Sequence, residues 1–392
     1  MKQGQTAAGA SEIELLGRLT GFNTVSSRSN LEMIEFIKSY LAALGVESVV
    51  LPDETGKKAS LMATIGPADK AGYVLSGHTD VVPVDGQDWS RDPFNMWRDG
   101  GRLYGRGVSD MKGYLACVLA CAPAMVKEPL AAPIHLAFSY DEEVGCFGVH
   151  GIIEHLKKTL PPQRAVFVGE PTEMGVVGSH KGSAGLLTTV VGKACHSSRP
   201  THGVNAIFHA MDLIGELRGY ANELRSTPDD DSAFVLPYTT VSVGVIHGGT
   251  ARNAVPGDCA FQWDIRATKA GVVNRLVDRF RTFADAKVVP VMKQGFPEAS
   301  VATSVAYDVP PFASVVASNA ETLAKRFSDR NDVSTANYGS EAGIFQAAGM
   351  PTIICGPGRD AEAHITDEWI AVEQLERCVG FIDRLIDHAR HG

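Results

Sequence analysis

The sequence predicts an α/β protein with one domain inserted into another. Up to about residue 180, strands and helices alternate as they do in a sheet covered by helices. A different order follows, namely strand, helix, two strands, helix and strand, and the first kind of pattern returns from about residue 310. The 392 residues are also more than one core usually serves. We therefore expect a first domain from residues 1–181 and 308–392, interrupted by a second domain from residues 182–307.

The first domain is expected to begin with two helices. Ser11 and Glu14 have the spacing of a capping box, which marks a helix start. The second helix is expected over residues 31–44, which place apolar side chains on one face, and it should end before Gly45. An unusually apolar helix is expected over residues 115–125, as if packed on a sheet. The strands of this domain are expected over residues 72–76, 134–138, 165–168 and 351–355, and a final helix over Leu375, Val379, Ile382 and Leu385.

The inserted domain is expected to be ferredoxin-like. Its strands are predicted over residues 185–191, 239–246, 258–266 and 299–307, and its helices over residues 204–224 and 272–284. The polar segment 226–232 contains a proline and several acids, and it is interpreted as an exposed loop.

Charge and composition indicate which kinds of molecule the protein binds. The net charge of −9, without a basic stripe, argues against nucleic acid and favours a small-molecule substrate. No apolar run approaches the roughly 20 residues that span a bilayer, and residues 1–10 lack the core of a signal peptide, so we expect a cytoplasmic protein without membrane attachment. Seven scattered cysteines argue against a disulfide framework, and Cys117 and Cys121 are expected to be packing residues.

Candidate metal ligands follow four of the expected strands. His78 comes after the first strand, Glu143 after the second, Glu170 after the third and His364 after the fourth. The carboxyl ends of strands in an open α/β sheet meet at one crevice, and imidazole and carboxylate groups suit Zn²⁺. Asp80, two residues after His78, is expected to hold the second ring nitrogen of that histidine. Any one of these pieces alone is more often surface decoration or a solvated turn.

Longer blocks around these residues resemble a known family. The blocks are Gly77-His78-Thr79-Asp80, residues 104–113, Asp141-Glu142-Glu143-Val144-Gly145, Gly169-Glu170-Pro171-Thr172 and the late His364. In this order and spacing they resemble the signatures of the M20 family of zinc amidohydrolases and peptidases, across nearly the whole chain. The resemblance implies a zinc-peptidase-like catalytic domain, with a mixed sheet flanked by helices, and an inserted ferredoxin-like lid and dimerisation domain. A nucleotide-binding interpretation of Gly105-Arg106-Gly107 fails, because the phosphate-loop pattern is missing.

The resemblance also implies the roles of individual residues. Asp110 would bridge two Zn²⁺ ions per subunit, for which Co²⁺ could substitute. His78 and Glu170 would complete one ion, and Glu143 and His364 the other. Glu142 would be the general base.

The inserted domain resembles the lid of the same family. His196 would reach the active site of a partner subunit and stabilise the oxyanion. Arg252, Asn253 and Arg266 would bind the α-carboxylate of the substrate, although an ion pair with a lid acid remains an alternative for Arg266. Gly339 and Ser340 match a substrate-contacting turn.

The details within the family resemble its deacylase branch, as does Glu at position 170. The expected reaction is hydrolysis of the amide bond of an N-acyl amino acid by a homodimer, with N-acetylornithine, an intermediate of arginine biosynthesis, as the first candidate. Desuccinylation of N-succinyl-diaminopimelate and dipeptide cleavage are the alternatives within the family. A non-catalytic dimeric scaffold is disfavoured, because such a protein would be expected to lose the base or a ligand.

Overall fold

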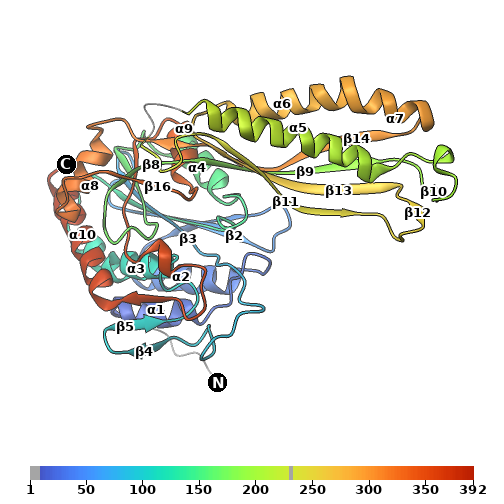
Figure 1. Cartoon of the computed structure of the whole chain (residues 1–392). Helices are drawn as coiled ribbons and strands as arrows, with labels where there is room; N and C mark the ends of the chain where they lie inside the picture. Colours follow the sequence, from blue (N-terminus) through green and yellow to red (C-terminus); the bar gives the residue numbers. More distant parts are fainter. Residues whose placement is uncertain (1–8, 229–232) are drawn as a thin grey trace. The chain divides into compact units, whose positions relative to one another are not determined.

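The structure, a computed structural model, describes residues 9–228 and 233–392 and divides into two units. Unit 1 contains Met1–Ser179, Phe312–Thr335 and Ser340–Gly392, and unit 2 contains His180–Pro311 and Ala336–Gly339. Figure 1 draws both units coloured along the chain. Most of the N-terminal segment from which a cytoplasmic location was expected, and residues 229–232 of the expected loop 226–232, lie outside the described residues.

A nine-stranded mixed sheet forms the centre of unit 1. Its order is β1 (Ser48–Pro52), β2 (Ala59–Ile65), β6 (Ile134–Ser139), β3 (Tyr73–His78), β7 (Ala165–Val168), β17 (Thr352–Ile354), β8 (Val177–His180) and β15 (Phe312–Ala313), with β16 (Ser334–Ala336) also paired to β8. The four middle strands β6, β3, β7 and β17 are parallel, whereas β2 and β8 run antiparallel to their neighbours. Strands β3 and β6 are buried along their whole length, as expected for parallel strands covered on both faces. The four expected strands therefore end at one edge.

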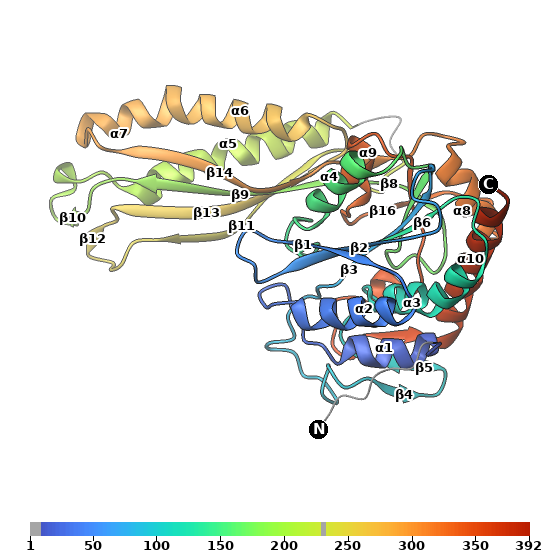
Figure 2. The ribbon, with the colours of Figure 1, turned by 180° about the vertical axis from the view of Figure 1, so that it is seen from behind.

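Helices cover both faces of this sheet. Figures 1 and 2 show α1 (Glu12–Thr20), α2 (Leu31–Ala43) and α3 (Lys112–Lys127) on one face and α4 (Val149–Thr159) on the other. The first face also packs against α8 (Asn319–Ser328) and α10 (Val372–His391), whose apolar side chains share its core, and α4 contacts the short α9 (Ala342–Ala347).

The structure confirms the predicted start of α1, the predicted end of α2 and the packing role of two cysteines. The Ser11 hydroxyl accepts from the Glu14 N–H at 3.3 Å and the Glu14 carboxylate accepts from the Ser11 N–H at 2.9 Å, which completes the capping box. Gly45, two residues after the end of α2, has a φ of 77°, in the left-handed region that favours glycine. Cys117 and Cys121 are buried in α3, as expected of packing residues.

A small three-stranded sheet in unit 1 was not predicted. It pairs β4 (Trp97–Asp99) with β5 (Arg102–Tyr104) and β5 with β18 (Trp369–Ala371). Strands of three residues carry too little alternation to be recognised in a sequence. This sheet places the turn after Tyr104 beside the segment before Trp369.

Unit 2 has the ferredoxin-like topology that the sequence predicted. Its antiparallel sheet has the order β11 (Thr240–Gly248), β13 (Asp258–Ala267), β9 (Gly182–Val191) and β14 (Ser300–Val309). Helices α5 (Ala206–Ser226) and α6 (Val272–Phe283) lie on one face (Figure 1). The helical segment does not end near 284 as expected, but continues through a π turn into α7 (Val289–Gly295). Pro290 is tolerated there because the first turn of a helix does not need its N–H.

Candidate metal centre

Five ligand candidates come together in unit 1 at the carboxyl edge of the four parallel strands. His78 is the last residue of β3, and Glu143 and Glu170 lie in the loops that follow β6 and β7. His364 lies in the loop between β17 and β18, and Asp110 ends the glycine-rich turn before α3. The donor atoms form two groups of three, in each of which all atoms lie within 4.8 Å of one another.

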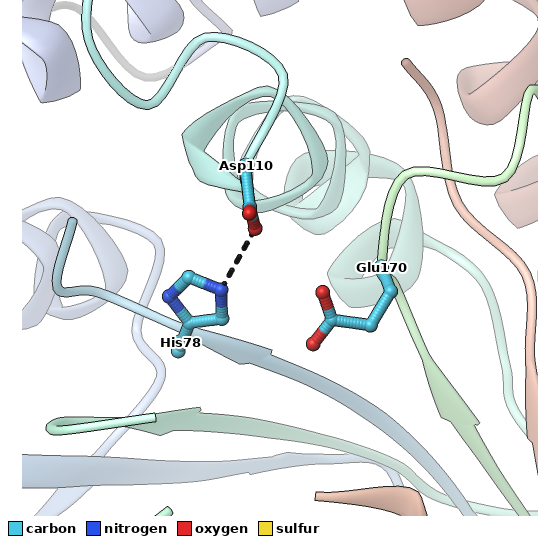
Figure 3. A group of neighbouring side chains, drawn as sticks. All are labelled: His78, Asp110 and Glu170. Atoms are coloured by element: carbon cyan, nitrogen blue, oxygen red, sulfur yellow. Dashed lines mark hydrogen bonds and ion pairs between the residues drawn. The ribbon is translucent and has the colours of Figure 1, made fainter. Parts of the chain in front are cut away.

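The first group contains His78, Asp110 and Glu170. His78 Nε2 lies 3.0 Å from Asp110 Oδ1. The Glu170 carboxylate faces the same space (Figure 3). Its Oε1 atom is buried and has no hydrogen-bond partner among the residues that the structure describes, so one buried acceptor is left for a ligand.

The second group contains Asp110, Glu143 and His364. His364 Nε2 lies 3.2 Å from Asp110 Oδ2 and 3.1 Å from Glu143 Oε2. Asp110 therefore directs its Oδ1 atom toward the first group and its Oδ2 atom toward the second. This is the arrangement that a carboxylate bridging two cations needs.

Electrostatics of the site favour added positive charge. Burial raises the pKa of Glu170 and of Glu142 well above the usual value, and it raises the pKa of Glu143 to about 7. Burial acts in the same direction on Asp110, but hydrogen bonds from His364 and His78 outweigh it and lower the pKa of this carboxyl. The same contacts with Asp110 and Glu143 raise the pKa of His364 to about 10. Divalent cations would offset the repulsion among these acids.

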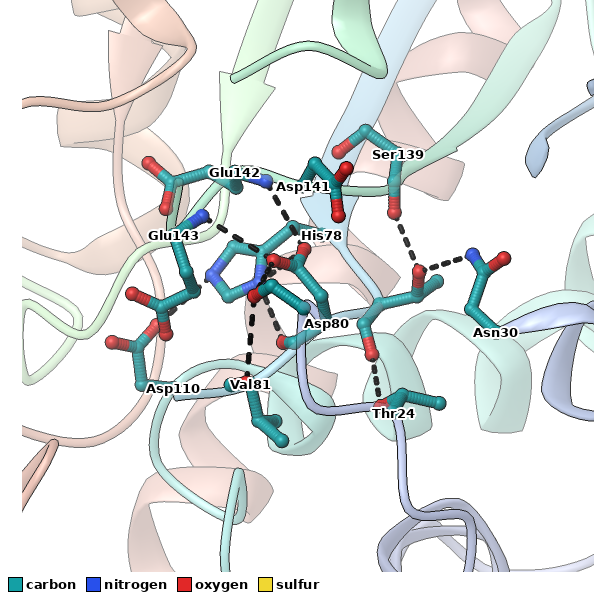
Figure 4. Close-up of polar contacts among 12 residues, drawn as sticks. Thr24, Asn30, His78, Asp80, Val81, Asp110, Ser139, Asp141, Glu142 and Glu143 are labelled. Atoms are coloured by element: carbon teal, nitrogen blue, oxygen red, sulfur yellow. Dashed lines mark hydrogen bonds and ion pairs between the residues drawn. The ribbon is translucent and has the colours of Figure 1, made fainter. Parts of the chain in front are cut away.

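Asp80 holds the site together differently from what we expected. The Nδ1 atom of His78 lies 3.0 Å from the main-chain carbonyl of Asp80, whereas the nearer carboxylate oxygen is 3.6 Å away. The Asp80 carboxylate instead accepts from the main-chain N–H groups of Glu142, at 3.1 Å, and Glu143, at 3.3 Å, and from the Ser26 hydroxyl at 2.7 Å. Figure 4 shows the contacts of Asp80 with His78, Glu142 and Glu143. Asp80 thus fixes the loop that carries two of the candidate site residues.

Glu142 has a fixed main chain and a nearly free side chain. Asp141, just before it, has a φ of 56° and forms an ion pair with Lys58 at 2.6 Å, which anchors the turn. Among the described residues, the half-buried Glu142 carboxylate accepts a hydrogen bond only from the thiol of Cys146, at 3.6 Å. No cation of the protein is hydrogen-bonded to this carboxylate among the described residues. It is therefore available to accept a proton.

Comparison with known proteins agrees with this geometry. The model of the peptidase family M20/M25/M40 matches residues 74–388. The chain belongs to this family. It is accordingly a metal-dependent amidohydrolase with an M20 peptidase fold.

Two relatives and one solved structure show the extent of the similarity. The chain is 31% identical over 364 residues to the acetylornithine deacetylase of Pasteurella multocida, covering 92% of this chain and 91% of that one. It is 31% identical over 386 residues to the acetylornithine deacetylase of Photorhabdus laumondii subsp. laumondii, covering 96% of each. An M20 family metallo-carboxypeptidase of Sulfolobus solfataricus has a TM-score of 0.77 at 17% identity, covering 98% of this chain and all of that one. Within the described residues, no helix is long and apolar enough to cross a membrane.

Three residues beside the metal centre of this M20 chain were missed by the sequence analysis. Glu368 and Arg106 form a fully buried ion pair at 2.8 Å behind Asp110. Glu341 is buried as well, receives a hydrogen bond from the Ser76 hydroxyl at 3.4 Å, and has a pKa raised to about 7 by burial. These partners are more than 250 residues apart in the sequence, so no local pattern could have indicated them.

In unit 2, three lid candidates of the M20 chain lie at one end of the sheet. His196 is in β10 (Cys195–His196), which pairs with β12 (Ala254–Val255) just after Arg252 and Asn253. The exposed ring of His196 has its Nδ1 atom 2.7 Å from the Ser198 hydroxyl and 3.1 Å from the Ser198 N–H. The Ser198 N–H must donate, so a neutral ring carries its proton on Nε2 and can donate from there.

Arg266 and Gly339 lie at the other end. Arg266 is eight residues from Asp258 along β13, which separates it from the His196 end by roughly 27 Å at the usual rise of a strand. Its Nε atom pairs with Asp264 at 3.1 Å. Gly339 packs against Ser183, the strand partner of Arg266, and is the last residue of unit 2. Ser340 begins the next part of unit 1, and its buried hydroxyl accepts from the Ala342 N–H.

Proposed function

We propose that this M20 enzyme hydrolyses the amide bond of N-acetylornithine and releases ornithine and acetate, a step of arginine biosynthesis. The observation that carries the proposal is the pair of ligand groups sharing Asp110, with the Glu142 carboxylate, which accepts from the Cys146 thiol, in the same loop as Glu143. The choice of substrate is supported by the two acetylornithine deacetylases, which resemble the chain over more than nine tenths of its length.

The metals in this proposal are two Zn²⁺ ions per subunit. His78, Asp110 and Glu170 would hold one ion, and Asp110, Glu143 and His364 the other. The residues fit this role because nitrogen and oxygen donors of this kind are usual for zinc, and because the buried Glu170 Oε1 has no hydrogen-bond partner in the described part of the chain. When bound, the ions would supply Lewis acidity, which lowers the pKa of water and polarises an acyl carbonyl.

The remaining chemistry is assigned to side chains of the protein. Glu142 takes a proton from the attacking water and later gives it to the departing amine, so one group serves as base and then as acid. Burial raises the pKa of Glu142 well above the usual value, so its carboxylate holds a proton more strongly than an exposed glutamate does. Asp80 keeps Glu142 in place through the main chain. His196 would donate from Nε2 to the oxyanion of the tetrahedral intermediate.

Substrate recognition is assigned to the arginines of unit 2, the proposed lid and dimerisation domain (residues 182–307). Arg252 and Asn253 lie beside His196, whereas Arg266 lies at the opposite end of the same sheet. One small substrate cannot touch both ends of a single lid. We therefore assign Arg252 and Asn253 to the active site that His196 serves, and Arg266 with Gly339 to the other active site of a dimer. The guanidinium fork of Arg266 would bind an α-carboxylate after leaving Asp264, and the Ser340 main chain would complete the Gly339 turn.

The proposed homodimer forms through the edge of unit 2. Strand β11 is an edge strand with exposed Val245 and Ile246. The adjacent helix α5 exposes Phe208 by 64% and Met211 by 60%, and Gly215 and Gly219 continue the same stripe with open space around them. A second copy could extend the sheet and cover this apolar stripe in one symmetric contact.

Mixing two inactive variants tests the dimer and the role of His196 in trans. His196→Ala and Glu142→Ala should each lose at least about 10²-fold in kcat, the usual effect of losing an oxyanion donor or a general base. In a mixed dimer, one site keeps both its own Glu142 and the partner's His196, so activity should return toward half per heterodimer. His202→Ala, which changes another exposed histidine of the same segment, is the control and should stay active alone. Demonstrated subunit exchange without recovered activity would rule out the trans assignment.

A substrate panel tests the reaction itself. We expect kcat/KM of the zinc-loaded enzyme to be at least about tenfold higher for N-acetylornithine than for N-acetylcitrulline, N-succinyl-diaminopimelate or a dipeptide, the size that one or two matched contacts provide. Preference for the succinylated substrate or for the dipeptide would assign the enzyme to another M20 activity. If the zinc-loaded protein is inactive on every amide, it is a binding protein and not an enzyme.

A further inference from the structure

A buried carboxylate holds the turn that presents Asp110. Glu368 is only 1% exposed. Its Oε1 atom accepts from the N–H groups of Ser109, at 2.8 Å, and Asp110, at 3.1 Å. Its Oε2 atom accepts from the N–H of Gly107 at 2.9 Å and from Arg106 Nη1 at 2.8 Å. Four donors use the full accepting capacity of the carboxylate, so the main chain of the turn is fixed at three points.

Arg106 continues this contact toward His364. Its side chain is 1% exposed and lies 4.9 Å from the ring of Trp89. Its Nη2 atom donates to Gln87 Oε1 at 2.7 Å, and the Nε2 atom of the same Gln87 donates to the main-chain carbonyl of His364 at 3.2 Å. A continuous chain of hydrogen bonds thus joins the main chain of Asp110 to the main chain of His364. None of these three side chains belongs to either ligand group.

A buried ion pair is a poor device for stability alone. Removing two charges from water costs about as much as their attraction returns, and a well-packed apolar pair often serves the fold equally well. Such a pair does fix geometry, because each hydrogen bond has a direction and a length. Here it links two of the three residues that would hold the second metal ion, Asp110 and His364, which are 254 residues apart in the sequence.

We propose that Glu368, Arg106 and Gln87 form a positioning network that sets the separation of Asp110 and His364, and so determines affinity for the second metal ion. The inference rests on the proposed metal centre and adds positioning residues to it. Glu368 acts on Asp110 and therefore on both ions, whereas Gln87 acts on His364 and on the second ion only. Loss of a partner that orients a metal ligand typically weakens metal binding by about 10- to 100-fold.

The test measures metal binding without substrate. Glu368→Gln replaces one carboxylate oxygen with an amide NH₂ group, so two of the four N–H donors lose their acceptor. This change should weaken both zinc sites by about 10- to 100-fold in chelator competition. Gln87→Leu should weaken only the second site, by about tenfold, and should add nothing in a His364→Ala background. Titration with Co²⁺ should show an altered visible spectrum for the second equivalent in both variants. Far-UV circular dichroism verifies folding, and Gln87→Leu, at a half-buried position, serves if Glu368→Gln does not fold.

Ser90→Ala is the matched control. Ser90 joins the same two loops, because its hydroxyl and N–H donate to Asp367, but it is not part of the network. Its zinc affinities should stay within about twofold of the wild type. An equal loss in this control, or unchanged affinities in folded Gln87→Leu and Glu368→Gln, would overturn the inference while leaving the metal centre intact. Wild-type protein that takes up fewer than two zinc ions would instead overturn the proposed dinuclear centre.

Discussion

Replacing Asp80 with asparagine separates two ways in which this residue could support the site. The carboxylate accepts three hydrogen bonds, two from the main chain of Glu142 and Glu143 and one from Ser26. The contact with the His78 ring is made by the Asp80 main-chain carbonyl, which the substitution does not alter. Asp80→Asn should therefore disturb the proposed base and leave the His78 ligand in place.

The expected size follows from the number of donors that lose an acceptor. One oxygen becomes an amide group, which cannot accept from the main-chain N–H that faces it, whereas the Ser26 hydroxyl can rotate and accept. One buried N–H without a partner costs about 1–3 kcal/mol, and the loss of negative charge weakens the other bonds. We expect a total cost of roughly 2–4 kcal/mol in the free energy of unfolding. A shift of about 1 Å in Glu142 would lower kcat by about 10²-fold.

Two measurements on the same preparations decide the matter. Steady-state kinetics should show the loss in kcat, and chelator competition should show zinc affinity within about twofold of the wild type. Ser26→Ala removes one hydrogen bond to the same carboxylate and spares both main-chain donors, so its kcat should change little. If Asp80→Asn instead loses zinc at the His78 site by about 10- to 100-fold, the carboxylate at 3.6 Å orients the ring after all, and the reasoning from the carbonyl contact is wrong.

Three further predictions concern the metals, the substrate and pH. Asp110→Ala should weaken both zinc sites and His364→Ala mainly one, and two full sites in the Asp110 variant by metal analysis would exclude a bridge. Arg266→Ala should raise KM for substrates with a free α-carboxylate much more than for their amides, whereas equal losses would show that Arg266 only pairs with Asp264. Burial lowers the pKa of His135 to about 4, so between pH 6.5 and pH 4 the unfolded chain binds a proton that the folded chain does not, and stability falls as the pH falls. Between pH 6.5 and pH 5, the free energy of unfolding should fall by about 2 kcal/mol less in His135→Leu than in the wild type, as measured by urea titration. Equal pH dependence in both proteins would contradict the assignment.

The sequence predicts those parts of the molecule whose causes are local. The strands that deliver His78 and Glu170 are short apolar runs ending at polar residues, and parallel pairing then brings their ends together without further information. The glycine-rich turn before Asp110 is also visible as a local pattern. The ferredoxin-like order of unit 2 follows from the order of its elements.

Contacts between distant segments could not be predicted in this way. Glu368 is the second of two adjacent acids before a tryptophan, and the pairing of β18 with β5 brings it under the Asp110 turn. The Asp80 carboxylate could have faced either its own histidine or the 141–143 loop, and the choice depends on where β6 ends relative to β3. Arg252 and Arg266 look alike in the sequence, but the length of β13 separates them.

The ligand candidates lie at the ends of strands that are far apart in the sequence. A bound metal ion would therefore also stabilise the fold of unit 1. A zinc ion held by Asp110, Glu143 and His364 would join segments from β6, the turn before α3 and the loop after β17, and so close a chain loop of more than 250 residues. At a free zinc concentration about 1,000 times the dissociation constant, binding would add about 4 kcal/mol to the stability of this unit alone. Unit 2 contributes none of these residues. The melting temperature of unit 1 should therefore be higher in zinc-loaded than in chelator-treated protein, and that of unit 2 should be the same in both.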